Sequence, residues 1–134
     1  MMKITMYAVV AAALATAGPA VRAQMQTITA GCTTDATGGD GVRRACTTEM
    51  TRISAPDGHV FAERTLVGGK TSANGSEHDC RVGWDDFVEV IPGTKILQPR
   101  TITLQAHARS PRGHFSGRGW VACRYEVQMA RYQP

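Results

Sequence analysis

The chain has 134 residues, 43% of them hydrophobic, and its 15 Lys and Arg residues against 11 Asp and Glu residues give a net charge of +4. Two of the basic residues, Lys3 and Arg22, lie in an N-terminal segment that we expect to be removed, which leaves a net charge of only +2. So small an excess excludes the broad basic surface that nucleic-acid binding requires, and we expect no nucleic-acid partner.

The first 23 residues have the pattern of a secretory signal peptide. Lys3 gives a positive start, residues 6–17 are an apolar run, and residues 20–23 offer small side chains where a signal peptidase reads them. We therefore predict that residues 1–23 are a signal peptide and that residues 24–134 form one periplasmic or secreted domain. The apolar run is shorter than the ~20 residues of a membrane-spanning helix, so we predict no transmembrane segment in the mature chain.

The mature chain begins with short alternating segments, which are typical of β-strands. Residues 25–33 alternate clearly, with Ile28 and Cys32 on the apolar face, whereas residues 43–53 alternate more weakly. The Gly- and Asp-rich residues 34–41 between them predict a hairpin turn or a long surface loop.

Turn residues separate the next segments. Residues 55–58 (Ala-Pro-Asp-Gly) predict a turn that leads into a strand at 59–67, and apolar residues on both faces of that strand suggest a central position in a sheet. Residues 68–76 are rich in Gly, Ser, Asn and Thr, and we expect an exposed loop there. In residues 80–84, Cys80, Val82 and Trp84 alternate and should face the core.

The C-terminal half contains the clearest strands. Short strands at 87–91 and 94–97 flank a Pro92-Gly93 pair that predicts a type II turn. Residues 101–109 and 120–132 then alternate strictly, with Ile102, Leu104, Ala106 and Ala108 on one face of the first and Val121, Cys123, Tyr125, Val127 and Met129 on one face of the second. Seven or eight short strands predict an all-β fold, either a single antiparallel β-sandwich or a small barrel.

An even set of four cysteines in an exported chain predicts two disulfides. Four cysteines allow three pairings, and sequence alone does not choose among them. Cys32 and Cys46 flank the Gly-rich loop on strands that we expect to be neighbours, and Cys80 and Cys123 lie on core faces. We therefore predict the pairs Cys32–Cys46 and Cys80–Cys123.

Two core cysteines near a tryptophan are typical of immunoglobulin-like sandwiches. Here Trp84 lies only four residues after Cys80, and Val121 replaces the tyrosine usual two residues before the second cysteine. An immunoglobulin-like architecture therefore fits the pattern, but membership of that family does not follow.

One loop concentrates side chains suited to ligand binding. Residues 109–120 join the two strongest strands and combine arginines, a histidine and aromatic residues with glycines. Guanidinium groups pair with carboxylate and phosphate oxygens, and glycine N–H groups can approach an anion closely. The alternative is a long hairpin loop that arginines keep in solvent, with its aromatic rings on the sandwich rim. The candidate ligand-binding residues are Arg109, Arg112, His114, Phe115, Arg118 and Trp120.

The sequence offers no metal or catalytic motif. The four histidines lack HxH or HxxxH spacing and the cysteines lack CxxC spacing, so we predict no metal site and no cofactor, with His107 the best single candidate. Asp85, Asp86 and Glu89 have the chemistry for calcium or for a carboxylate pair, but an acidic run more often forms a solvated face. No serine lies in a G-x-S-x-G elbow, and we predict no catalytic residue.

These features favour an exported binding module rather than an enzyme. We expect the 109–120 loop to engage an anionic component of the cell envelope, such as a glycan or a lipid head group, or a protein partner. The alternative is a structural or inhibitory envelope protein that acts by protein–protein contact, and a small hydrolase is the third hypothesis.

Overall fold

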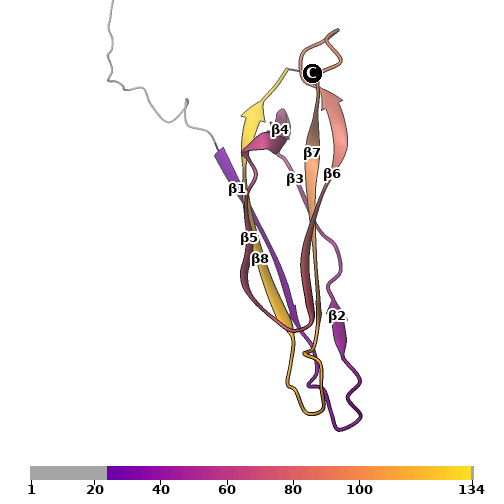
Figure 1. Cartoon of the computed structure of the whole chain (residues 1–134). Coiled ribbons are helices and arrows are strands. Elements are labelled where there is room, and N and C mark those ends of the chain that lie inside the picture. The colour runs from indigo at the N-terminus through magenta and orange to yellow at the C-terminus, as the bar shows by residue number, and fades with distance from the viewer. Residues whose placement is uncertain (1–23, 134) are drawn as a thin grey trace, which may run out of the picture.

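Two antiparallel sheets face each other in an elongated β-sandwich, seen edge-on in Figure 1. The computed structural model describes residues 24–133, which form eight strands and one 3-10 turn. The predicted signal peptide at residues 1–23 lies outside the described residues. The sheets stay separate instead of closing into a barrel, so the sandwich alternative is the correct one.

The first sheet is built around strand β8 (Trp120–Arg131). Strand β1 (Gln24–Thr33) pairs with one side of β8 along its whole length. The other side pairs first with β5 (Val67–Asn74) and then with β4 (His59–Phe61), which are separated by the 3-10 turn η2 (Glu63–Thr65).

The second sheet repeats this plan around strand β7 (Leu97–Arg109). The long strand β6 (Glu77–Glu89) pairs with one side of β7. The short strands β2 (Ala45–Thr47) and β3 (Thr51–Ser54) pair with successive parts of its other side. Each sheet therefore consists of a central strand with one strand on one side and two successive strands on the other.

The alternation of the two central strands is confirmed. Ile102, Leu104, Ala106 and Ala108 of β7 are fully buried, and Val121, Cys123 and Val127 of β8 face them across the core. Phe61 is also fully buried, and its ring centroid lies 6.3 Å from that of Trp84. The inward direction predicted for Trp84 is therefore confirmed as well.

Both predicted disulfides are present, but their placement differs from expectation. Cys80–Cys123 joins β6 to β8, and Cys32–Cys46 joins β1 to β2. The expectation that Cys32 and Cys46 lie on neighbouring strands is wrong, because β1 pairs with β8 and β2 pairs with β7. Both disulfides thus connect the two sheets, and such bonds persist in an oxidising compartment.

Several local predictions also need correction. Residues 68–76 are mostly strand β5 rather than a loop, because β8 provides hydrogen-bonding partners that composition does not reveal. The strand expected at 59–67 is broken by η2 and lies at a sheet edge, not at its centre. The segment 43–53 is divided into β2 and β3, and the strands expected at 80–84 and 87–91 lie mostly in the longer β6. The strand expected at 94–97 is wrong, because residues 94–96 belong to the turn region and only Leu97 is in β7.

The two predicted turns are confirmed. The His59 amide donates to Pro56 O at 3.0 Å, and the Thr94 amide donates to Ile91 O at 3.1 Å. The second of these turns closes the β6–β7 hairpin, which stands at one end of the sandwich.

Candidate functional site

Two crossing loops meet at the opposite end of the sandwich (Figure 1). Residues 34–44 lead from β1 to β2, and residues 110–119 lead from β7 to β8, so each loop passes from one sheet to the other. The 109–120 segment is therefore not a hairpin loop, because β7 and β8 belong to different sheets. We call residues 34–44 and 110–119 together the loop pair.

Backbone hydrogen bonds hold the two loops side by side. The Thr34 amide donates to Gly119 O at 2.8 Å and the Thr37 amide donates to Gly117 O at 2.9 Å, which makes Thr37 and Gly117 an isolated β-bridge. The loops thus continue the pairing of β1 with β8 beyond the ends of the strands.

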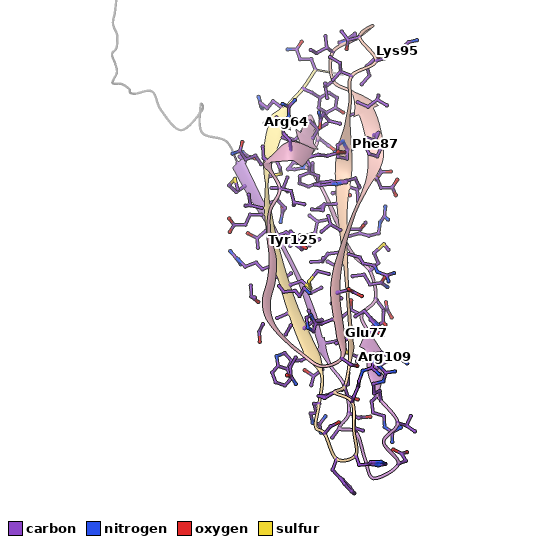
Figure 2. The ribbon with its side chains drawn as sticks, viewed as in Figure 1. Arg64, Glu77, Phe87, Lys95, Arg109 and Tyr125 are labelled. Atoms are coloured by element: carbon purple, nitrogen blue, oxygen red, sulfur yellow. A yellow bond between two sulfur atoms is a disulfide. The ribbon has the colours of Figure 1, made fainter. Side chains whose placement is uncertain are left out.

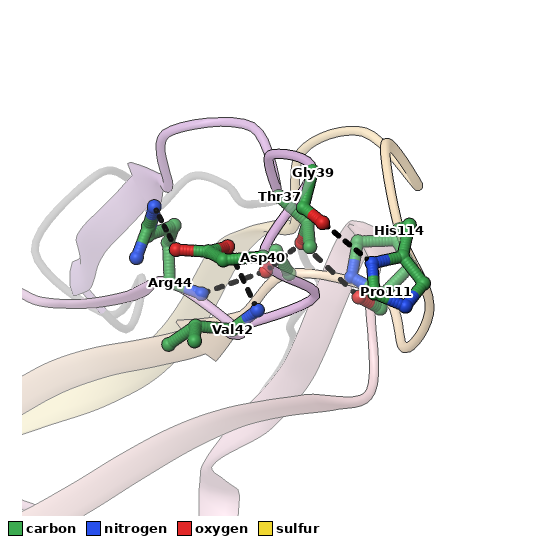
Figure 3. A network of polar contacts seen from close by, with 8 residues as sticks. Thr37, Gly39, Asp40, Val42, Arg44, Pro111 and His114 are labelled. Atoms are coloured by element: carbon green, nitrogen blue, oxygen red, sulfur yellow. Dashed lines mark hydrogen bonds and ion pairs between the residues drawn. The ribbon is translucent and has the colours of Figure 1, made fainter.

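A network of hydrogen bonds through two hydroxyl groups joins the two loops at the base of the loop pair (Figure 3). The Arg44 amide donates to Ser110 Oγ at 2.8 Å, and Ser110 Oγ lies 2.6 Å from Thr37 Oγ1. Thr37 Oγ1 in turn donates to Pro111 O at 3.2 Å. Because Ser110 is 0% and Thr37 is 2% exposed, the hydrogen bond between their hydroxyl groups is shielded from competing water.

At the tip, an aromatic side chain is exposed but its backbone is anchored. Phe115 is 81% exposed, and its φ of 51° lies in the left-handed region that bulky residues avoid. The Phe115 amide donates to Gly38 O at 3.0 Å, and its ring lies so close to Gly39 that a Cβ there would be 2.8 Å from the ring. The neighbouring His114 Nδ1 lies 2.7 Å from Gly39 O, so this nitrogen carries the proton that it donates.

An acidic residue stabilises the other loop. Asp40 Oδ1 accepts a hydrogen bond from the Val42 amide at 3.0 Å, and Asp40 Oδ2 lies 3.4 Å from Arg44 Nη2. The Val42 amide, assisted by the Arg44 guanidinium, holds the pKa of Asp40 below its usual value. The sequence predicted a hairpin turn or a long surface loop at residues 34–41, and the structure shows a loop. Its part in this site was missed, because no local pattern shows which loop it contacts.

The structure brings some of the predicted ligand-binding residues together and separates others. Arg112, His114 and Phe115 lie at the exposed tip of the loop pair. Arg109 lies at the end of β7, with its Nη1 3.6 Å from Glu77 Oε2, and Figure 2 shows these two residues at the loop end of the sandwich.

The remaining two side chains make hydrogen bonds within the protein, Arg118 inside the loop pair and Trp120 to β5. Arg118 Nη1 donates to Thr34 O at 2.9 Å and lies 3.9 Å from Asp35 Oδ1. Trp120 lies on β8, and its Nε1 donates to Ser72 Oγ of β5 at 3.0 Å. The six candidate residues therefore do not form a single ligand-binding site.

A second polar cluster surrounds His107 on the outer face of the second sheet. His107 Nδ1 lies 2.8 Å from Thr47 Oγ1, and its Nε2 lies 3.6 Å from Glu77 Oε1. A cavity of about 140 Å³ opens here. It is lined by Thr47, Glu77, Asp79, Arg81, Gln105 and His107. Within residues 24–133, no three His, Cys, Asp or Glu side chains are grouped closely enough to hold a metal ion.

The acidic run near residue 85 is engaged within the protein. Arg52 Nη2 donates to Asp85 Oδ2 at 3.0 Å, Thr101 Oγ1 donates to Asp86 Oδ2, and the Lys95 amide donates to Glu89 Oε2 at 2.7 Å. The Arg52 guanidinium, with the Asp86 amide, lowers the pKa of Asp85. Asp86 Oδ2 also lies 3.9 Å from Arg52 Nη2, so Asp85 and Asp86 share this guanidinium, whereas Glu89 binds a backbone amide.

Comparison of the chain with protein-family models, with curated proteins and with solved structures found no match. In the described part of the chain, no helix has the length and apolar character needed to cross a membrane.

Proposed function

We propose that this protein is an exported protein-binding module whose contact surface is the tip of the loop pair. The observation that carries this proposal is Phe115, whose side chain is 81% exposed although its backbone is held in a strained conformation. Export is supported by the signal-like residues 1–23 and by two disulfides that tie the sheets together.

An anchored, exposed aromatic ring suits protein recognition. Burying a phenylalanine side chain in a partner contributes roughly 1.5–3 kcal/mol. The hydrogen bonds at Gly38 and Gly39 already order the tip, so little conformational entropy remains to be lost on binding. Aromatic anchors of this kind are typical of the few residues that dominate binding energy.

The chemistry around Phe115 indicates what the partner surface contains. Arg112 is exposed on the same loop as Phe115, three residues before it. We expect a partner protein with an apolar pocket for the ring and a carboxylate near the pocket to pair with Arg112.

An anionic glycan or lipid head group is a weaker fit. Arg109 already faces Glu77, and Arg118 already donates to Thr34 O, so their guanidinium groups are committed to their own chain. Arg112 alone of the three has no side-chain hydrogen bond or ion pair within residues 24–133. With a single available guanidinium, the tip is better suited to a protein partner than to a polyanionic ligand.

A binding experiment tests the proposal. The protein is immobilised and exposed to envelope extract of its host, captured proteins are identified by mass spectrometry, and binding is repeated with the purified partner. We expect Phe115→Ala to weaken the purified interaction by about tenfold or more, equivalent to about 1.4 kcal/mol.

Phe87→Ala is the matched control, because Phe87 is 50% exposed near the opposite end of the molecule (Figure 2). It should leave binding unchanged. Equal affinity for the wild type and Phe115→Ala would overturn the proposal. So would a protein that binds only anionic glycans or anionic vesicles and loses that binding in Arg112→Ala.

A further inference from the structure

Three of the four edges of the two sheets carry features that prevent another strand from pairing there. Such features include charges, short strands and bulges. The β2–β3 edge consists of two strands of three and four residues, and the β4–β5 edge is interrupted by η2 and by a register shift between Lys70 and Ser72. The edge strand β6 is long, but it contains Glu77, Asp79, Arg81, Asp85, Asp86 and Glu89.

Strand β1 has none of these features. Its ten residues, Gln24–Thr33, include no charged residue and no proline. They pair with β8 in one unbroken register, from Gln24 opposite Met129 to Thr33 opposite Trp120. In the part of the chain that the structure describes, β1 pairs with β8 alone, so its other edge is open.

The direction of the backbone groups along β1 follows from one hydrogen bond. The Thr34 amide donates to Gly119 O, so even-numbered residues direct their N–H and C=O groups toward β8. The N–H and C=O groups of the odd-numbered residues therefore point to the open edge. These residues are Met25, Thr27, Thr29, Gly31 and Thr33.

We propose that β1 pairs with β1 of a second copy of this chain, antiparallel about a two-fold axis at Thr29. This register sets Thr29 opposite Thr29, Thr27 opposite Gly31 and Met25 opposite Thr33, so each outward N–H meets a C=O. The first sheets of the two copies then form one continuous sheet. A two-fold contact must be self-complementary, and an uncharged strand meets itself without like charges.

The absence of charge also favours a second copy over a charged peptide, which would find no opposite charge along this edge. The proposal goes beyond the protein-binding function and does not depend on it, because β1 and the tip of the loop pair are different surfaces. Each β1 leads at its C-terminal end into the loop pair. Antiparallel pairing therefore places the two loop pairs at opposite ends of the dimer.

The variant Thr29→Glu tests the contact. Thr29 lies opposite Arg124 of β8 within one copy, so the new carboxylate has an opposite charge beside it in the monomer. In the dimer it would face its own copy across the axis. Gln128→Glu is the matched control, since it adds the same charge at an exposed position of β8, whose two edges are already paired.

Sedimentation velocity of the exported, disulfide-bonded protein provides the readout. We expect the wild type and Gln128→Glu to be dimers, and Thr29→Glu to dissociate at least about tenfold more readily. A wild type that is monomeric at about 0.1 mM overturns the proposal, as does equal dimerisation of the two variants.

Hydrogen exchange of the wild type gives a second measurement that does not depend on any variant. The dimer protects the amides of Thr27, Thr29 and Gly31 as well as those of their even-numbered neighbours. Rapid exchange at the three odd-numbered amides, with slow exchange at the even-numbered ones, would show that the edge is open in solution and would overturn the proposal.

Discussion

Thr37 and Ser110 are 73 positions apart in the sequence, and their hydroxyl oxygens lie 2.6 Å apart in a buried hydrogen bond. Ser110 Oγ also accepts a hydrogen bond from the Arg44 amide. This one hydroxyl group therefore joins the two loops at the point where Ser110 follows β7 and Arg44 precedes β2. The conformation of the exposed tip depends on this buried polar contact.

We expect Ser110→Ala to destabilise the protein by about 1–3 kcal/mol. The substitution removes the acceptor of the Arg44 amide and one of the two hydrogen bonds of the Thr37 hydroxyl, which keeps its bond to Pro111 O. Losing the partner of a buried polar group carries a cost of that size. Chemical denaturation monitored by tryptophan fluorescence measures the change. Glu49→Ala, at an exposed position between β2 and β3, is the control and should change stability by less than about 0.5 kcal/mol.

The two disulfides should differ in their contribution to stability. They close loops with sequence separations of 14 and 43, for which chain entropy gives about 3 and about 4 kcal/mol. We expect the double variant Cys80→Ala with Cys123→Ala to lose more stability than Cys32→Ala with Cys46→Ala. Denaturant titrations compare the variants, and the reverse order would contradict this account.

Gly75 occupies a position that no other residue fits. Its φ is 121°, and a Cβ there would overlap Arg109 O where the chain passes from β5 to β6. We expect Gly75→Ala to destabilise the protein by about 3 kcal/mol or more, because backbone strain and steric overlap combine. Gly58→Ala is a matched control with a φ of 76° and open space around the new methyl group, and should cost about 1 kcal/mol.

The ion pair of Asp85 and Arg52 should make the free energy of unfolding depend on pH in the acid range. The pKa of Asp85 is lowered from its usual value of 3.8, so the folded state favours the ionised carboxylate. This stabilising contribution is complete above the unfolded-state pKa and is lost as the pH falls through the lower folded-state pKa. NMR titration of the Asp85 carboxyl carbon should show its midpoint move up in Arg52→Gln. In Arg81→Gln, which removes an exposed arginine of β6, the midpoint should not move.

The side chains that face the core were predictable, because the face of a strand residue depends on local alternation. A side chain's face in a strand is set by its position parity, which is why the burial of Ile102, Leu104 and Cys123 followed from sequence. The pairing of Cys80 with Cys123 followed from the same parity, since both cysteines point into one core. Residues 68–76 were mispredicted because a Gly- and Ser-rich segment forms a strand only when a neighbour such as β8 provides its hydrogen bonds.

The candidate site was less predictable than the core. The sequence indicated Arg112, His114 and Phe115 as a group, but it could not reveal that Arg109 and Arg118 bind their own chain. The contribution of Gly39, which lies under the Phe115 ring, required knowledge of which loops meet. Such contacts join residues far apart in the chain, and no local pattern records them.

By itself, the sequence determined the all-β class and the inward faces of the main strands, because these depend on residue type and period-two alternation. The two disulfide pairs were predicted correctly, although Cys32 and Cys46 lie on strands of different sheets and not on neighbouring strands. Only the tertiary structure decided which sheet each strand joins. That choice rests on backbone pairing between distant segments, and it brings residues 34–44 against residues 110–119. It also leaves the uncharged strand β1 at an open edge, where only its position in the sheet makes it available to another strand.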